Sequence, residues 1–129
     1  MIEEITKKTS IQDFKDILNN NWRDGYTIPS ARLYPFQWNW DAGFIALALT
    51  YMNQDRAMQE VNSMFDSQWS NGMLPHIAFH KLNDNYFPGP EVWQTDDLEV
   101  SSNKVSSTGI TQPPVFGFIL KRMHQQMQG

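Results

Sequence analysis

Aromatic rings and one carboxylate are concentrated in the stretch YPFQWNWDAGF, residues 34–44. Within it, Trp38, Trp40 and Asp41 lie within four positions, directly before an apolar run. Ring faces can stack on a ligand and a carboxylate can accept its hydrogen bonds, but such rings also pack in protein cores. The stretch is therefore either a piece of core or a site built at the edge of a core, and we favour the second interpretation.

The composition limits the class of protein. The chain has 129 residues, is 40% hydrophobic and 19% charged, and carries a net charge of −4, which suits one globular domain or a piece of a larger one. No basic surface favours nucleic acid as a partner. Because the chain has no cysteine, it has neither a disulfide framework nor a thiolate metal site. No cofactor motif or metal-ligand spacing is present, so we expect neither a cofactor nor a metal.

The same survey bears on location. No apolar run reaches the roughly 20 residues that a membrane span needs. The first ten residues, MIEEITKKTS, mix charges and lack the apolar centre of a signal peptide. We therefore expect a cytoplasmic protein without a membrane partner.

Two amphipathic helices are predicted. The first has Ser10 as N-cap and ends near Asp24-Gly25, and the other has Asp55 as cap and ends before residues 70–76. Apolar residues recur at helical spacing in both. The predicted buried stripes are Ile11, Phe14, Ile17, Leu18 and Trp22 in the first, and Ala57, Val61, Met64, Phe65 and Trp69 in the second. On the second helix, we expect water to face Arg56, Gln59, Glu60, Asn62 and Asp66.

Two further helices are apolar all round. One spans residues 42–52, with Asp41 where an N-cap would stand, and the other starts at Pro113-Pro114. A helix without a polar face is enclosed by protein on every side. The long stretch from Asn71 to Gln112 contains several aromatic residues and is expected to be ordered, with short strands near residues 77–80.

The alternation of amphipathic and apolar helices predicts an all-α fold. About four helices form two layers, with the amphipathic helices outside and the apolar helices inside. Each inner helix follows a long loop, so both inner helices should begin at the same end, where a site would form. The alternative is an ordinary four-helix bundle with long crossover connections.

Four motifs in order carry a resemblance to a known family: YPFQWNWDAGFIALAL, NGMLPHIAFH, YFPGP and GITQPPV. Together they resemble the N-terminal part of six-hairpin glycoside hydrolases with an (α/α)6 barrel. The family in question contains processing α-glucosidase and the mannosylglycerate and glucosylglycerate hydrolases. The resemblance implies a partial (α/α)6 barrel and predicts that residues 1–129 are an N-terminal fragment of a single catalytic domain.

The resemblance also implies a mechanism. Such enzymes invert the configuration at the anomeric carbon of the sugar. They use two carboxyl groups about 6.5–9.5 Å apart, one protonating the leaving oxygen and the other activating water. By resemblance both groups would lie beyond Gly129, so no catalytic residue is expected in this chain. Whether the chain itself is an enzyme stays open at this point.

The residues implied to bind substrate are Tyr34, Trp38, Asp41, Tyr86 and Gln112. Sugars present C–H faces that stack on rings and hydroxyls that need acceptors, which suits these types. The alternative for Asp41 is a helix cap. Phe36 and Trp40 are predicted to pack and orient this loop, the three histidines are predicted to be structural, and Gln37 and Asn39 receive no role.

We therefore predict the carbohydrate-binding portion of an inverting glycoside hydrolase that acts on a small α-glucoside or α-mannoside, such as a glycosylglycerate. The chain should be inactive alone. Its expected partners are a small sugar or glycoside and either a second copy or the remaining part of the barrel. The alternative is a stand-alone helical module that binds sugar or another protein without catalysis.

Overall fold

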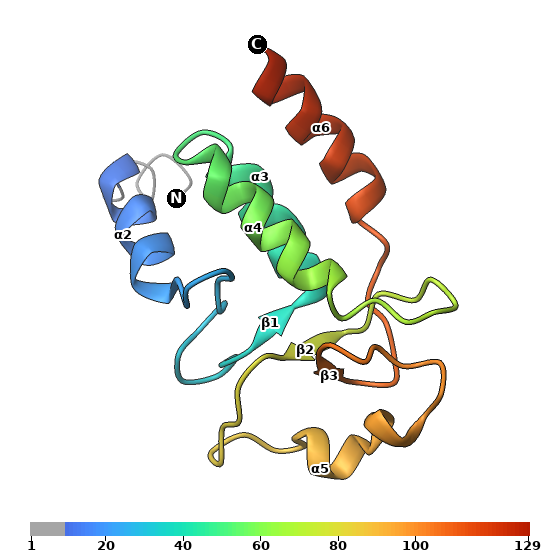
Figure 1. Ribbon diagram of the computed structural model, residues 1–129. Helices are drawn as coiled ribbons and strands as arrows, with labels where there is room; N and C mark the ends of the chain where they lie inside the picture. Colours follow the sequence, from blue (N-terminus) through green and yellow to red (C-terminus); the bar gives the residue numbers. More distant parts are fainter. Residues whose placement is uncertain (1–9) are drawn as a thin grey trace.

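The computed structural model describes residues 10–129, and Figure 1 shows its longer helices on one side of a small sheet. The helices are α2 (Ile11–Asn21), α3 (Asn39–Leu49), α4 (Gln54–Phe65), α5 (Pro90–Trp93) and α6 (Phe116–Gln128), with a 3-10 turn η1 (Thr95–Asp97). The strands are β1 (Gln37–Trp38), β2 (Ile77–Phe79) and β3 (Ser106–Ser107). The expectation about a signal peptide concerns the first ten residues, nearly all of which lie outside the described part.

Helix α2 begins as predicted, but only the end of its predicted stripe is covered, where Leu18 and Trp22 pack against the core. The Ser10 hydroxyl accepts from the Asp13 amide at 3.2 Å, and the Asp13 carboxylate accepts from the Ser10 amide at 2.6 Å, which is a capping box. Ile11, Phe14 and Ile17 are 54–76% exposed, because no described segment lies over that side of the helix. The apolar pattern of α2 predicts a buried face, but no segment within residues 10–129 covers the part of that face formed by these three side chains.

Helix α3 starts three residues before the predicted position. The chain enters it directly from β1, with Trp38 as the extended N-cap residue, so Asp41 lies in the first turn and the cap expectation for Asp41 is wrong. The helix packs against α4 and α6. It is not enclosed on every side, since Phe44 and Ala48 are exposed.

Helix α4 buries Ala57, Val61 and Met64, which confirms the centre of its predicted stripe. Its N-cap is Asn53, whose side chain accepts from the Arg56 amide at 3.0 Å, rather than Asp55. The prediction for Glu60 is wrong, because this side chain is 0% exposed. Polar partners from β1 and from the loop before it make that burial tolerable, and helical periodicity cannot show them.

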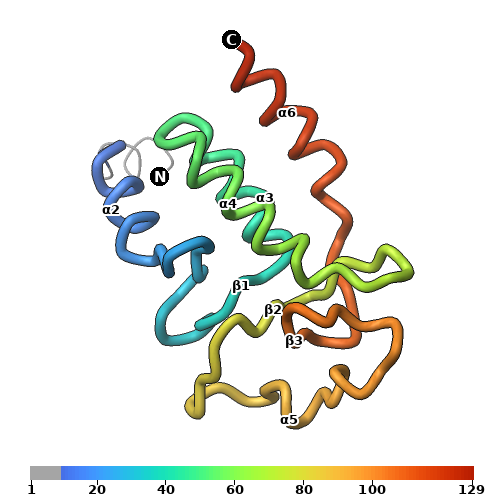
Figure 2. Tube along the Cα trace, viewed as in Figure 1, coloured from blue at the N-terminus to red at the C-terminus, as the bar shows by residue number. Residues whose placement is uncertain are grey.

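The three strands form an antiparallel sheet in the order β1-β2-β3. Gln37 pairs with Ala78, and Ala78 in turn pairs with Ser107. The helices of the all-α expectation are present, but the expectation is incomplete, because the fold also contains this sheet. The strand expected near residues 77–80 is β2, but β1 and β3 are two residues each and too short to show an alternating pattern. Figure 2 shows the long connection between β2 and β3 looping away from the helices.

Two clusters make up the core. The helical cluster is aliphatic apart from Phe116 and consists of Ala42, Ala46, Leu49, Ala57, Val61, Met64, Ala78, Phe116, Ile119 and Met123. The aromatic cluster surrounds β1 and β2 and consists of Phe36, Trp38, Ile77 and Phe79, with Tyr86 and Trp93 packed against it. Among residues 10–129, none of the helices has the length and apolar character to cross a bilayer.

Candidate functional site

The starts of the two inner helices meet at one end of the molecule. The Trp40 amide, in the first turn of α3, donates a hydrogen bond of 3.0 Å to Gln112 Oε1, four residues before α6. These residues are 72 positions apart in the chain. The expectation that α3 and α6 begin at the same end is confirmed, and the sheet lies at that end as well (Figure 1).

A pocket of about 360 Å³ opens beside this hydrogen bond. Four of the five predicted substrate-binding residues line it, namely Tyr34, Trp38, Asp41 and Gln112. Trp40 and His76 complete its wall. The ring of Tyr34 meets that of Trp38 edge to face at 5.2 Å between centroids, so the two rings form one corner of the pocket.

Tyr86, the fifth predicted residue, does not line this pocket. Its ring packs edge to face against Phe36 at 5.2 Å and against Trp38 at 5.6 Å. It therefore supports the Trp38 ring within the aromatic cluster. Burial and the nearby Tyr34 both raise the pKa of the Tyr86 hydroxyl.

Asp41 is the carboxyl group of the pocket. It is half-buried in the first turn of α3, where the positive end of the helix dipole favours an anion. Burial raises its pKa, and its own backbone amide, the Trp40 side chain and His76 partly offset that effect. A partly desolvated carboxylate in this position is a strong acceptor for hydroxyl groups.

His76 is predicted from the sequence to be structural, yet it faces the same pocket as Asp41. Burial lowers the pKa of its imidazole, and the neighbouring Asp41 works in the opposite direction. Its Nδ1 is buried and has no hydrogen-bond partner among the described residues. The isolated position of His76 in the sequence carries no signal of this neighbourhood.

The prediction for Trp40 is wrong, and two amide side chains that received no role from the sequence have structural ones. Trp40 was predicted to pack, but it is 45% exposed and lines the pocket, whereas Phe36 is buried as predicted.

Asn39 fastens the start of α3 to the neighbouring loop, because its Nδ2 donates to the carbonyls of Leu74 at 3.1 Å and Pro75 at 3.0 Å. Gln37, the other amide, is fully buried and bonded to α4. The structural roles of these two amides could have been predicted, because an amide residue inside a buried aromatic stretch is usually hydrogen-bonded.

The arrangement offers groups that can bind a sugar. It combines ring faces, one carboxylate and an amide, the set expected around a sugar. Among the residues that line the pocket, only Asp41 carries a carboxyl group. Within residues 10–129, no three acidic, histidine or cysteine side chains come together in a way that could hold a metal ion.

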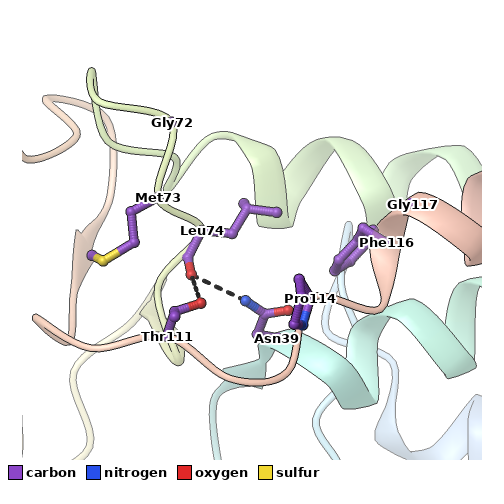
Figure 3. A pocket seen from close by; sticks show the side chains of 8 residues that line it. All are labelled: Asn39, Gly72, Met73, Leu74, Thr111, Pro114, Phe116 and Gly117. Carbon is purple, nitrogen blue, oxygen red and sulfur yellow. Dashed lines mark hydrogen bonds between the residues drawn. The ribbon is translucent and has the colours of Figure 1, made fainter.

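A second cavity, of about 270 Å³, lies on the other side of Asn39 and is drawn in Figure 3. Thr111 and Asn39 both donate to the Leu74 carbonyl there, at 2.6 and 3.1 Å. No titratable side chain lines this cavity, so it is a poorer candidate for a site. Its lining residues are Asn39, Gly72, Met73, Leu74, Thr111, Pro114, Phe116 and Gly117.

Comparison with known proteins gives a consistent result. Residues 34–129 match the family model described as the mannosylglycerate hydrolase MGH1-like glycoside hydrolase domain. The chain is 42% identical over 120 residues to mannosylglycerate hydrolase MGH2 of Selaginella moellendorffii, covering 93% of this chain and 24% of that protein. It is 39% identical over 117 residues to glucosylglycerate hydrolase of Mycolicibacterium hassiacum, covering 88% of this chain and 26% of that protein.

A solved structure shows the same likeness in three dimensions. The GH63 mannosylglycerate hydrolase of Thermus thermophilus, in complex with Tris and D-glycerate, superimposes with a TM-score of 0.76 at 41% sequence identity. The match covers 86% of this chain and 25% of that one. The chain thus spans about a quarter of the length of the relatives that it matches.

Proposed function

Since this chain belongs to the family of mannosylglycerate hydrolase MGH1-like glycoside hydrolase domains, we propose that it forms the sugar-binding portion of an inverting glycoside hydrolase. The proposed substrate is a small α-mannoside or α-glucoside such as a glycosylglycerate. The observation that carries the proposal is the pocket in which Trp38, Asp41 and Gln112 converge at the starts of α3 and α6.

The pocket supports a pyranose as ligand. The rings of Tyr34 and Trp38 meet edge to face and form an apolar corner against which sugar C–H groups can pack. Asp41, in the first turn of α3, can accept hydrogen bonds from hydroxyls. Because Gln112 Oε1 already accepts from the Trp40 amide, the Nε2 amide protons of Gln112 are the groups that can donate to a sugar oxygen.

The single carboxyl group supports a division of labour within the whole enzyme. Inversion requires a general acid and a general base about 6.5–9.5 Å apart, and the residues that line this pocket supply one carboxyl group. We propose that Asp41 binds substrate and that the acid and base come from other parts of an (α/α)6 barrel. On this proposal the 129-residue chain binds glycosides and does not cleave them.

The choice of substrate class is supported by the names of the relatives. Two of them are named for mannosylglycerate and glucosylglycerate, and the Thermus thermophilus structure holds D-glycerate. These ligands belong to the relatives, and for this chain they define the first compounds to test. We also propose that the protein acts in the cytoplasm, which fractionation of cells that express it would test.

Binding is tested by tryptophan fluorescence. Titration of the purified chain with mannosylglycerate and glucosylglycerate should change the emission, because a ligand in the pocket contacts Trp38 and Trp40. Trp38→Phe should lose most of the change, whereas Trp22→Phe should keep it. Trp22 is a matched control because it lies under the Arg56 guanidinium, 4.4 Å from the ring centroid, and not at the pocket. If Trp38→Phe and Trp40→Phe both respond like wild type, the pocket is not the site.

Catalysis is tested separately. The purified chain should release no glycerate from mannosylglycerate in a coupled assay, and release should appear only when the remaining part of the barrel is supplied. Turnover by the chain alone that disappears in Asp41→Ala would contradict the proposed division of labour while leaving the sugar site in place.

A second candidate function is a helical module that binds another protein. The observation that favours it is the exposed apolar side of α2, formed by Ile11, Phe14 and Ile17. Size-exclusion chromatography with light scattering distinguishes the two proposals in part. A monomer that binds no glycoside would support the interaction module over the enzyme fragment.

A further inference from the structure

The side chain of Glu60 is completely buried on the side of α4 that faces the core. It lies on α4, is 0% exposed, and is flanked in the helix by the buried Ala57, Val61 and Met64. An ionisable group in such a position is costly unless it is well hydrogen-bonded. The function proposed above does not use Glu60, so its burial calls for another reason.

The Glu60 carboxyl group has two side-chain donors. Thr27 Oγ1 donates to Oε2 at 2.7 Å, and Gln37 Nε2 donates to Oε1 at 2.8 Å. Gln37 Nε2 also lies 2.9 Å from the Glu60 carbonyl oxygen. Thr27 and Gln37 are themselves almost wholly buried. The three residues therefore form a closed network between α4, β1 and the loop before it.

The hydrogen bonds of this network fix the orientation of the Gln37 amide and the position of the proton on His80. Because Gln37 Nε2 donates to Glu60, Gln37 Oε1 faces His80, whose Nε2 lies 2.7 Å away. His80 Nε2 must then carry the proton, which the neutral imidazole provides. Burial lowers the pKa of His80 to about 4, in agreement with a neutral ring. Tyr26 packs on the imidazole at 4.3 Å between ring centroids and limits its movement.

The network ends at the wall of the sugar pocket. Gln37 and Trp38 together form β1, and Trp38 is also the N-cap residue of α3 and has no side-chain cap bond. Trp38 is therefore held through its neighbours: Gln37 ties β1 to α4, and the pairing with β2 ties it to the sheet. A change in Gln37 would shift the β1 backbone and, with it, the indole ring that lines the pocket.

We propose that Glu60 is a positioning residue that fixes Gln37 and thereby holds the Trp38 ring in the geometry that the pocket requires. The role in ligand binding rests on the proposed function. Glu60 itself does not line the pocket and would act through β1.

The first test compares two truncations on the same helix. Glu60→Ala removes the acceptor of Gln37, whereas Val61→Ala removes buried methyl groups at a position with no part in the network. At a temperature where both variants are folded, Glu60→Ala should raise the Kd for mannosylglycerate by about tenfold, because a small misplacement of a binding group has a large effect. Val61→Ala should stay within about twofold of wild type. Equal Kd changes in both variants would show a purely structural role and overturn the proposal.

Two more variants guard against a failure to fold. Glu60→Gln keeps an oxygen that can accept from Gln37, so it should restore most of the affinity that Glu60→Ala loses. Gln37→Met breaks the same link from the strand side with a side chain of similar size, and it should raise the Kd as Glu60→Ala does. If Glu60→Gln fails to rescue a folded protein, or if Gln37→Met binds like wild type, the proposal is wrong.

A second measurement separates this proposal from the proposed function. The indole N–H resonance of Trp38, assigned by its loss in Trp38→Phe, should move in the nitrogen–proton NMR spectrum of Glu60→Ala and stay in place in Val61→Ala. If wild type binds no glycoside but the resonance moves, the sugar function fails and the positioning role stands. If the resonance stays in place in Glu60→Ala, the positioning role fails whatever the chain binds.

Discussion

The aromatic cluster and the helical cluster are both well buried, but they differ in what surrounds them. The aromatic cluster around β1 and β2 has Tyr86 and Trp93 packed against it, and a pocket lies at its edge. The helical cluster is well packed between α3, α4 and α6, but the outer sides of its helices carry exposed Phe44 and Phe118. Helix α2 shows the same feature on the side that bears Phe14.

On the proposed function, the aromatic cluster serves ligand binding and the exposed helix faces serve contact with another surface. The rings of the aromatic cluster and of Tyr34 contact one another edge to face, which favours a fixed shape for the pocket. Exposed apolar helix faces gain free energy when another surface covers them. We therefore expect ligand binding and stability to respond to different residues.

The largest effect is expected in the helical cluster. Ile119→Ala removes a fully buried side chain of α6 and should lower the free energy of unfolding by about 2–5 kcal/mol, measured by urea denaturation. Phe118→Ala, one residue away and 51% exposed, is the matched control and should cost less than about 1 kcal/mol. The folded fraction of Ile119→Ala should bind glycosides normally. A parallel loss of affinity would show that the two clusters are not independent.

The next effect concerns pH and the network between the clusters. Burial raises the pKa of Glu60 to about 7, with hydrogen bonds from Thr27 and Gln37 and the charge of Arg56 acting in the opposite direction. The folded chain therefore holds a proton that the unfolded chain loses above about 4.5, so stability falls as pH rises from there to 7. His80 has the reverse effect, because its pKa is lowered from 6.5 to about 4 and stability rises over that interval.

The two contributions oppose each other, each on the order of 3 kcal/mol. Between pH 4.5 and 6.5 they should nearly cancel in wild type. Glu60→Gln should leave a stability that rises with pH in this range, and His80→Gln should leave one that falls. Urea midpoints at several pH values measure the slopes. Slopes of the same sign in the two variants would contradict the network.

A smaller effect is expected at the pocket. Asp41→Asn keeps the shape of the side chain and removes its charge, so the Kd for mannosylglycerate should rise by about tenfold, equivalent to the loss of one charged hydrogen bond. Titration calorimetry measures it. Asp55→Asn, a change of the same kind in the first turn of α4, is the control and should bind like wild type. If both variants bind like wild type, Asp41 does not contact the ligand.

The smallest effect on stability is expected at α2. Phe14→Ser replaces a side chain that is 58% exposed, so the free energy of unfolding should change by less than about 0.5 kcal/mol. The same variant should reduce self-association in sedimentation velocity, because it removes the centre of the exposed apolar stripe. Unchanged association would show that α2 is not the contact surface between copies.

The sequence was most informative where local rules decide the structure. The N-cap at Ser10 and the centre of the buried stripe of α4 follow from residue types at fixed spacing, and both are present. Tyr34, Trp38 and Asp41 could be grouped because they lie within eight positions of one another. Gln112 could be added to the group only through the family resemblance, and the structure brings it to the same pocket.

The errors come from contacts between distant segments. Glu60 borders the buried stripe of α4, but its charge predicts a side chain in water, and only Gln37 and Thr27, more than twenty positions away, make its burial tolerable. His76 reaches Asp41 through the pairing of β1 with β2, and strands of two or three residues leave no periodic signal. The exposed stripe of α2 shows the converse, because its pattern predicts a neighbour that the described residues do not contain.

The hydrogen bond from the Trp40 amide to Gln112 has a consequence for the order of assembly. It closes a loop of 72 positions, and a ligand that contacts both ends would hold that loop shut. Such a ligand at about one hundred times its Kd would add about 2.7 kcal/mol to the free energy of unfolding. Substrate would then hold the two ends of the loop together, and the pocket would reach its final shape only after the segment that contains Gln112 had been made.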